Sequence, residues 1–152
     1  MKFLARTALL SAVLAVSAPA FALSATQTVK KEIITVDERG VETITYASAE
    51  LVTPGERVAY ALDYVNDEDE AATDLVLTMP VPDVVSFVEG SARGQGTVIT
   101  YSVDGKTFSD RESLKNGDRM ATSEDISHIR WNIAGPIAPG ESGTLMFSGT
   151  LK

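Results

Sequence analysis

The sequence predicts an all-β protein, an antiparallel β-sandwich of about seven to nine short strands with no helix. Beyond residue 22, no segment repeats apolar residues at helical spacing over several turns. Apolar and polar residues alternate instead, and turn residues interrupt the alternation about every ten positions. The chain has no cysteine, so a disulfide is excluded and the core has to hold the fold by packing alone.

The strongest strand signal covers residues 57–66. Its even-numbered positions from Val58 to Tyr64 carry large apolar side chains, and the odd-numbered positions between them carry alanine or aspartate. A period of two puts all the large apolar side chains on one face of a strand. The same pattern recurs in the segments 99–103, 129–133 and 145–151.

Turn residues separate these strands. Pro54-Gly55 and Pro139-Gly140 each predict a turn just before an alternating strand. Asp104-Gly105 follows the segment 99–103 and predicts a tight hairpin turn, after which we expect a strand to resume at Phe108. Weaker signals predict strands in the segments 31–36 and 41–46, around a turn at 38–40, and in the segments 74–79 and 84–88. A chain of this length with this many short strands favours a sandwich of immunoglobulin-like shape.

The first 22 residues have the pattern of a cleaved secretory signal peptide. Two basic residues precede an apolar run at positions 8–16, and Ala20-Phe21-Ala22 supplies the small residues that signal peptidase reads. The run is too short to cross a bilayer of roughly 30 Å. We therefore expect an exported, periplasmic or extracellular protein that starts at Leu23 and keeps no membrane anchor.

Residues 23–152 suit a single domain, in which 23–49 form leading strands and 50–152 the main sandwich. Removing residues 1–22 takes away two basic residues and no acid, so the net charge moves from −8 to −10. A negative charge of this size repels phosphate backbones and anionic membrane surfaces. It excludes nucleic acid as an expected partner.

Several blocks in the region 50–152 have a recognisable order. They are Val52-Thr53-Pro54-Gly55-Glu56, Asn66, Pro80-Val81-Pro82, Phe87-Val88-Glu89-Gly90-Ser91, Tyr101-Ser102-Val103-Asp104-Gly105, Ile129-Arg130-Trp131 and Ala138-Pro139-Gly140-Glu141. In this order they resemble the bacterial "conserved repeat" domain DUF11. The resemblance implies an immunoglobulin-like, exported structural or binding module, and it names no chemistry.

Four consecutive acids at positions 67–70 follow the strand 57–66. Calcium takes six to eight oxygen ligands, and clustered carboxylates between strands can supply several of them. If calcium binds here, Asn66, Asp67 and Asp69 are the expected ligands. The alternative is a solvated acidic turn, since the segment lacks the glycine-punctuated spacing of a calcium loop.

The segment 109–123 is long for a loop in a small domain and is rich in charge. Long loops on a rigid scaffold often carry binding residues. If the protein has a partner, its expected contacts in this segment are Asp110, Arg111, Lys115 and Arg119.

The sequence offers no catalytic site. It has no cysteine nucleophile, no glycine-flanked serine at a strand-to-helix turn, and only one histidine, His128. Trp131 lies on the apolar face of its strand and is expected in the core. We therefore expect no enzyme, no cofactor other than the calcium alternative, and no catalytic residue.

The function predicted from these observations is that of an exported, non-catalytic structural or protein-binding module. Two alternatives stay open. One is a calcium-dependent adhesion or matrix module. The other is a fibre subunit, in which residues 26–36 add a strand to the sheet edge of a neighbour. The sequence identifies neither the partner nor the oligomeric state.

Overall fold

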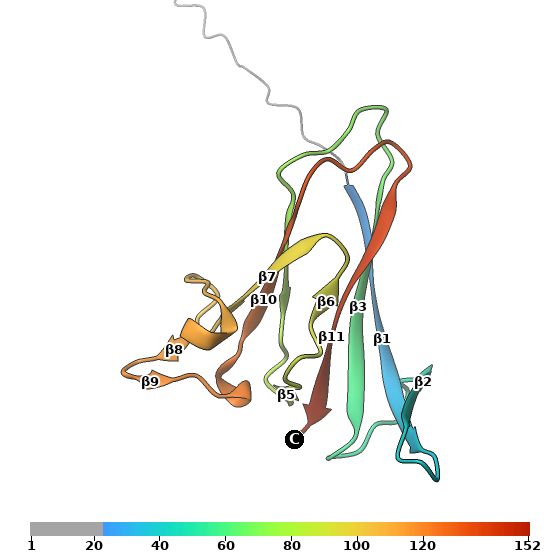
Figure 1. The fold of residues 1–152 in the computed structure, drawn as a ribbon, viewed down its shortest axis with the longest axis vertical. Helices are drawn as coiled ribbons and strands as arrows, with labels where there is room; N and C mark the ends of the chain where they lie inside the picture. Colours follow the sequence, from blue (N-terminus) through green and yellow to red (C-terminus); the bar gives the residue numbers. More distant parts are fainter. Residues whose placement is uncertain (1–22) are drawn as a thin grey trace, which may run out of the picture.

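The computed structural model describes residues 23–152, so the predicted signal peptide lies outside the described residues. These residues form strands and two short 3-10 turns, at Arg111–Ser113 and Ser123–Asp125 (Figure 1). The prediction of an antiparallel all-β sandwich is confirmed. Within 23–152, no helix has the length and hydropathy needed to cross a membrane.

The larger sheet is antiparallel, with the strand order β2-β1-β3-β11-β5 and with β6 as a further short neighbour of β11. Its strands are β1 (Leu23–Val36), β2 (Glu42–Ser48), β3 (Arg57–Asn66), β5 (Val85–Phe87), β6 (Arg93–Gly94) and β11 (Ser142–Leu151). The long central strands β3 and β11 are in register from Val65 beside Ser142 to Arg57 beside Thr150.

A smaller sheet packs against it, with the order β4-β10-β7. Its strands are β4 (Val76–Pro80), β7 (Thr97–Ser102) and β10 (His128–Ile133). A two-stranded ribbon, β8 (Lys115–Asn116) with β9 (Arg119–Met120), lies in a lobe beside it (Figure 1).

The core lies between the two sheets. Trp131 and Ile129 from β10 and Leu145 and Phe147 from β11 have no exposed surface. The rings of Tyr60 and Phe147 stack with centroids 4.9 Å apart. Burying an apolar side chain of this size stabilises the fold by roughly 1.5–3 kcal/mol, so a chain without cysteine can hold this sandwich by packing. The prediction that Trp131 fills the core is confirmed.

Two differences from the predicted strands have local causes. β1 starts at Leu23 instead of residue 31, because pairing with β3 makes a strand of a segment whose residues are too polar to show alternation.

No strand resumes at Phe108. The Asp104-Gly105 turn forms, with Gly105 at φ +73°, but only Ser109 then pairs with β7, while the Phe108 ring stacks under Arg130.

Two crossover loops, β3 to β4 and β10 to β11, lie side by side at one end of the sandwich (Figure 1). Ala72 and Ile137 bridge them with two backbone hydrogen bonds of 2.9 and 2.8 Å. Asn66 belongs to the same contact, because its N–H donates to the Glu141 carbonyl and its own carbonyl accepts from the Gly140 N–H. The two loops therefore form one hydrogen-bonded unit.

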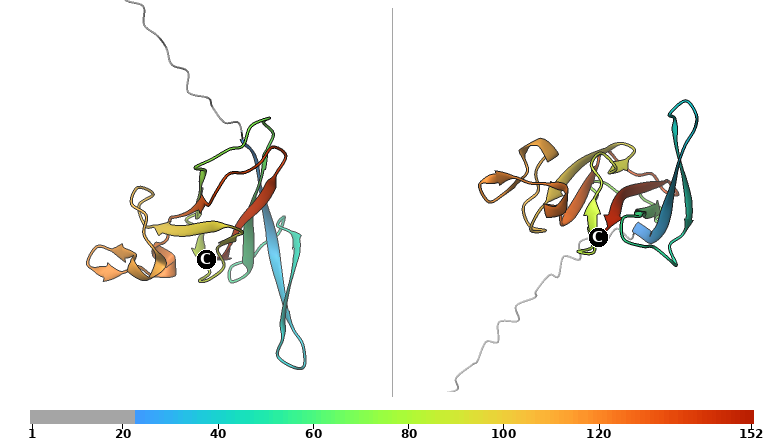
Figure 2. Two further views of the ribbon diagram at one scale, coloured as in Figure 1. Left: turned by 45° about the horizontal axis from the view of Figure 1, so that its top comes forward. Right: turned by 90° about the horizontal axis from the view of Figure 1, so that it is seen from below.

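At the opposite end, β1 and β2 project from the body as a hairpin, which we call the arm (residues 33–48; Figure 2). β1 pairs with β3 only as far as Glu32, whereas its pairing with β2 runs from Lys30 to Val36. The turn of the arm is closed by Asp37, whose Oδ1 accepts the N–H groups of Arg39 and Val41 at 2.8 and 2.9 Å. The predicted turn at 38–40 is confirmed.

Candidate functional site

Within residues 23–152, the arm and the residues beside it carry most of the exposed large apolar side chains. Of the eleven large apolar side chains exposed within the described residues, seven lie between positions 29 and 51. Five of them lie in the arm, Ile33, Ile34, Val36, Val41 and Tyr46, and the other two, Val29 and Leu51, lie just outside it. Isolated exposed apolar residues are ordinary, but a cluster on one projecting element marks an interaction surface.

Each face of the arm carries an exposed isoleucine, and the face of Ile33 is otherwise lined mainly by threonines. Ile34 lies opposite Ile44 on one face, and Ile33 lies opposite Thr45 on the other. A two-stranded ribbon is only marginally stable in water without a layer packed against it. The arm thus presents β-branched side chains in a strand conformation that a protein partner can extend or cover.

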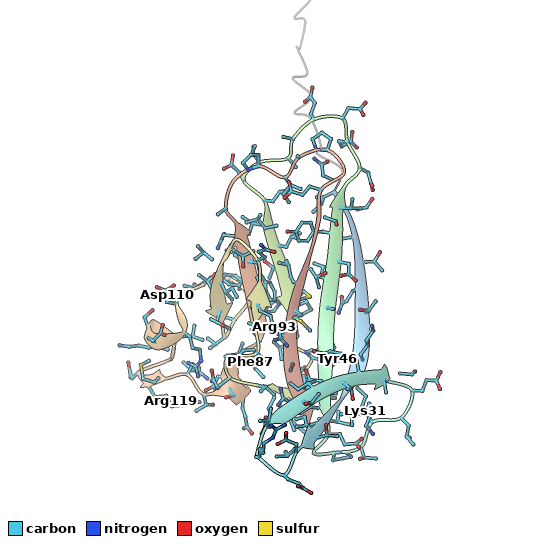
Figure 3. The ribbon with its side chains drawn as sticks, turned by 45° about the vertical axis from the view of Figure 1, so that its right-hand side comes forward. Lys31, Tyr46, Phe87, Arg93, Asp110 and Arg119 are labelled. Atoms are coloured by element: carbon cyan, nitrogen blue, oxygen red, sulfur yellow. The ribbon has the colours of Figure 1, made fainter. Side chains whose placement is uncertain are left out.

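Charged pairs hold the base of the arm to the body. Glu32, whose side chain has no exposed surface, lies with Oε2 2.9 Å from Arg57 Nε, and its Oε1 accepts the Ser148 hydroxyl at 2.5 Å. The Arg57 contact is an ion pair without the angle of a hydrogen bond. Lys31 Nζ lies 2.6 Å from Glu56 Oε1. Figure 3 shows Lys31 and Tyr46 where the arm crosses the end of the large sheet.

Glu56 also closes the turn before β3. Its Oε2 accepts the Thr53 N–H at 2.7 Å, and the Glu56 N–H donates to the Thr53 carbonyl at 3.0 Å. The hydrogen bond from Lys31, followed by that from the Thr53 backbone, lowers the pKa of Glu56 from 4.5 to about 2. Both interactions therefore stabilise the ionised form in the folded protein.

This lowered pKa gives a prediction for acid stability. A depressed pKa contributes stability that is present above about pH 4.5 and lost as the pH falls toward about 2. We expect Glu56→Gln to lower the melting temperature near neutral pH and to flatten its fall between about pH 5 and 2, measured by circular dichroism. Glu124→Gln, at an exposed carboxylate on the far lobe, is the control; an equal effect there would contradict the assignment.

Beside the arm, a shallow groove of about 170 Å³ lies on the outer face of the large sheet. Tyr46 forms one wall, and small side chains of β3, Ala59 and Ala61, form the floor. Thr144 and Met146 from β11 complete the far side. Thr28, Lys30 and Asp63 also line the groove, so it is of mixed polarity.

The acidic loop after β3 is organised around the buried side chain of Asn66. Asn66 is buried, and its side-chain amide donates to the carbonyls of Glu70 and Ile137 at 2.8 and 2.9 Å. Its Oδ1 accepts the Glu68 N–H at 3.1 Å. Asp67 and Asp69 are exposed. Within residues 23–152, no group of three or more histidine, aspartate or glutamate side chains is placed to hold a metal ion. Calcium at Asn66, Asp67 and Asp69 stays a prediction.

The calcium prediction has a direct test. If calcium binds at this loop, adding it raises the melting temperature, and replacing Asp67 and Asp69 together with asparagine removes that rise. Magnesium added at the same concentration controls for ionic strength. A calcium-dependent rise that survives the double substitution would assign the ion to another place.

The segment 109–123 is a folded lobe and not an open loop. Its two 3-10 turns and the β8–β9 ribbon pack on Leu114, Ala121 and Ile126, which are buried. Lys115, one of the predicted contacts, is exposed on β8 beside Met120. Sequence reasoning took the segment for a loop because its buried residues are too few and too irregularly spaced to show a period.

Two of the predicted partner contacts in this lobe are used internally. Arg111 pairs with Glu89 through Nε and Nη2, at 3.0 and 2.5 Å, and this contact lowers the pKa of Glu89 and raises that of Arg111. Arg119 pairs with Asp125 at 2.6 Å and holds the pKa of that carboxyl well below its usual range. Of the remaining two, Asp110 is exposed like Lys115 (Figure 3).

The sequence predicted the two strands of the arm but not that they form an exposed hairpin. The segment Ile33-Ile34-Thr35-Val36 carries β-branched residues at odd and even positions alike. β-branched residues at both parities are typical of a strand buried on both faces, so the sequence carried no signal that this ribbon is exposed.

The fold and this surface define a class of protein, a cysteine-free antiparallel β-sandwich with a projecting apolar hairpin. Comparison of the chain with protein-family models, with curated proteins and with solved structures finds no match.

Proposed function

We propose that the chain is an exported, non-catalytic protein-binding module and that the arm is its binding element. The observation that carries this proposal is the concentration of exposed apolar side chains on one two-stranded ribbon. Protein interfaces are built around buried apolar anchors, and an exposed ribbon recruits a partner by strand pairing or by packing on its faces.

The arm is also positioned for binding. Its base is fixed by Glu32, Arg57 and Lys31, so the ribbon leaves the body in a defined direction. Holding the ribbon in its bound shape lowers the entropy lost on association. The partner that suits this element presents an apolar strand or patch, with few acids, since the chain itself is acidic.

The resemblance of residues 50–152 to the DUF11 domain supports the same role, because it implies an extracytoplasmic structural or binding module. The fibre alternative needs residues 26–36 in the sheet of a neighbour. In the structure these residues pair with β3 and β2 of their own chain. We therefore prefer a module that keeps its N-terminal strand and binds with the tip of the arm.

Site-specific photo-crosslinking in the producing cell tests this proposal. A photoreactive phenylalanine at Val36, which is 60% exposed on the arm, is expected to give a discrete adduct with a different protein. The matched control is the same residue at Val98, 58% exposed on β7 of the smaller sheet. Equal labelling at both positions, or adducts from Val98 alone, would exclude the arm as the binding element.

Binding of the captured partner then gives the second measurement. Val36→Asp places a charge in the interface and is expected to weaken binding by about tenfold or more, equivalent to about 1.4 kcal/mol. The melting temperature stays unchanged, because Val36 is paired only within the arm. Unchanged affinity in a folded Val36→Asp variant would contradict the proposal.

A further inference from the structure

The first half of β1 has a free edge. β1 pairs with β3 from Leu23 to Glu32, whereas β2 covers its other side only from Lys30 onward, where Lys30 faces Ser48. No described strand pairs with the other side of this part of β1. A seven-residue slot, residues 23–29, is therefore open at the edge of the large sheet.

The backbone groups that face this slot follow from the register. Asn66 faces β11, since it exchanges backbone hydrogen bonds of 2.9 and 2.7 Å with Glu141 and Gly140. The backbone N–H and C=O groups of successive residues point to opposite sides of a strand. Those of odd-numbered β3 residues such as Asp63 therefore point to β1. Asp63 lies opposite Thr26, so the backbone groups of the even-numbered β1 residues point to β3. The groups left on the free edge belong to Leu23, Ala25, Gln27 and Val29.

Nothing in the slot blocks strand addition. Residues 23–29 contain no charged residue and no proline, which are the usual protections of an exposed edge. Every residue from Ser24 to Gln27 is exposed. An unprotected, uncharged edge of this kind is a template for another strand.

We propose that this edge pairs with the same edge of a second copy of the chain, antiparallel about a two-fold axis at Thr26. In this register each odd-numbered residue lies opposite an odd-numbered residue of the second copy. Ala25 pairs with Gln27, and Leu23 pairs with Val29. All four free backbone positions of each chain are then hydrogen-bonded. Within the described residues the slot runs from Leu23 to Val29, and Ser48 of β2 closes it beside Lys30.

Side chains support self-pairing over addition of a foreign strand. Val29 is 41% exposed on the inner face, and the proposed register covers it with Leu23 of the second copy. The next residue, Lys30, is exposed and has no ion pair within the described residues. The same register brings it toward the acidic loop 67–70 of the second copy, which follows Asn66 opposite Leu23. Both contacts occur twice by symmetry.

Because the chain has no cysteine, a single introduced thiol tests the register. In the proposed dimer Thr26 faces itself in a non-hydrogen-bonded pair, where the Cα atoms are about 4.5 Å apart, within disulfide range. Thr26→Cys in the chain 23–152 is expected to form a disulfide-linked dimer under mild oxidation. Thr28→Cys is the matched control, because the two residues 28 are about 13 Å apart along the paired strands.

Equal disulfide formation by both variants, or by neither, would overturn the proposal, and so would an adduct of Thr26→Cys with a foreign protein in place of itself. Light scattering gives an independent readout. The unmodified chain is expected at twice the monomer mass, and Gln27→Pro, which removes one free-edge N–H from each copy, weakens the dimer by about tenfold or more. Gln27→Ala keeps that N–H and the dimer. These variants leave the arm unchanged, so failure here does not affect its proposed role.

Discussion

Replacing Asn66 with alanine is expected to lower the free energy of unfolding by about 2–4 kcal/mol. The side chain is 1% exposed, and it makes three hydrogen bonds to backbone groups of the two crossover loops. Alanine leaves the Glu70 carbonyl and the Glu68 N–H without these partners. It also removes the side-chain link between the loop after β3 and the loop before β11, so cooperative unfolding in urea, followed by circular dichroism, is the measurement.

Asn132→Ala is the matched control for this prediction. Asn132 also donates to a backbone carbonyl, that of Val98, but over 3.4 Å and from a partly exposed position. Loss of this hydrogen bond is expected to lower the free energy of unfolding by about 0.5 kcal/mol or less. If the two variants unfold at the same urea concentration, the hydrogen bonds of the Asn66 side chain do not stabilise the fold as proposed.

Asn66→Asp separates hydrogen bonding from shape. The carboxylate has the size of the amide but no N–H to donate, and at neutral pH it faces the carbonyl oxygens of Glu70 and Ile137. We expect it to destabilise the fold at least as much as alanine. Protonation of the introduced carboxylate in this variant restores one hydrogen-bond donor. The difference in unfolding free energy between the variant and the unmodified chain should therefore shrink as the pH falls.

The parts of the fold that the sequence predicted are those governed by local chemistry. The strand at 57–66 was predicted with the bounds of β3, because one apolar face against one small or polar face leaves a strand little choice of orientation. The two Pro-Gly turns were also predicted. Gly55 and Gly140 have φ of +91° and +75°, and the glutamate after each reaches back to the residue before the proline.

The parts that the sequence did not predict depend on partners distant in the chain. Residues 23–30 are too polar to signal a strand, and only the backbone of β3 makes them one. Asn66 was named only as a ligand of the conditional calcium site, because its acidic neighbours are visible in sequence and its hydrogen bond to Ile137, 71 positions away, is not. The exposure of the arm was hidden for the same reason, since β-branched residues read as a buried strand until the end of β3 is known.

Replacing Arg57 with alanine is the second large effect, a loss of about 3 kcal/mol of unfolding free energy. The Glu32 side chain has no exposed surface, and Arg57 is its cation at 2.9 Å. Without Arg57 the carboxylate keeps only the Ser148 hydroxyl. Removing one member of a buried ion pair leaves an uncompensated charge, and that penalty exceeds the net value of the pair.

A double variant distinguishes this penalty from lost packing. Glu32→Gln keeps the size of the side chain and an acceptor for Ser148 without the charge, so Glu32→Gln with Arg57→Ala is expected to be more stable than Arg57→Ala alone. If the double variant is the less stable one, the loss is due to packing of the Arg57 side chain and the charge argument fails.

The same variants test how the arm is held. Glu32 is the last β1 residue paired with β3, so an unbalanced charge there acts where the arm leaves the sheet. Hydrogen exchange of Arg57→Ala should therefore speed up more for the amides of β2 than for those of β11, which is flanked by β3 and β5. Uniform acceleration would mean that the pair stabilises the sandwich as a whole. Selective acceleration in β2 would mean that the ion pair fixes the arm to the body.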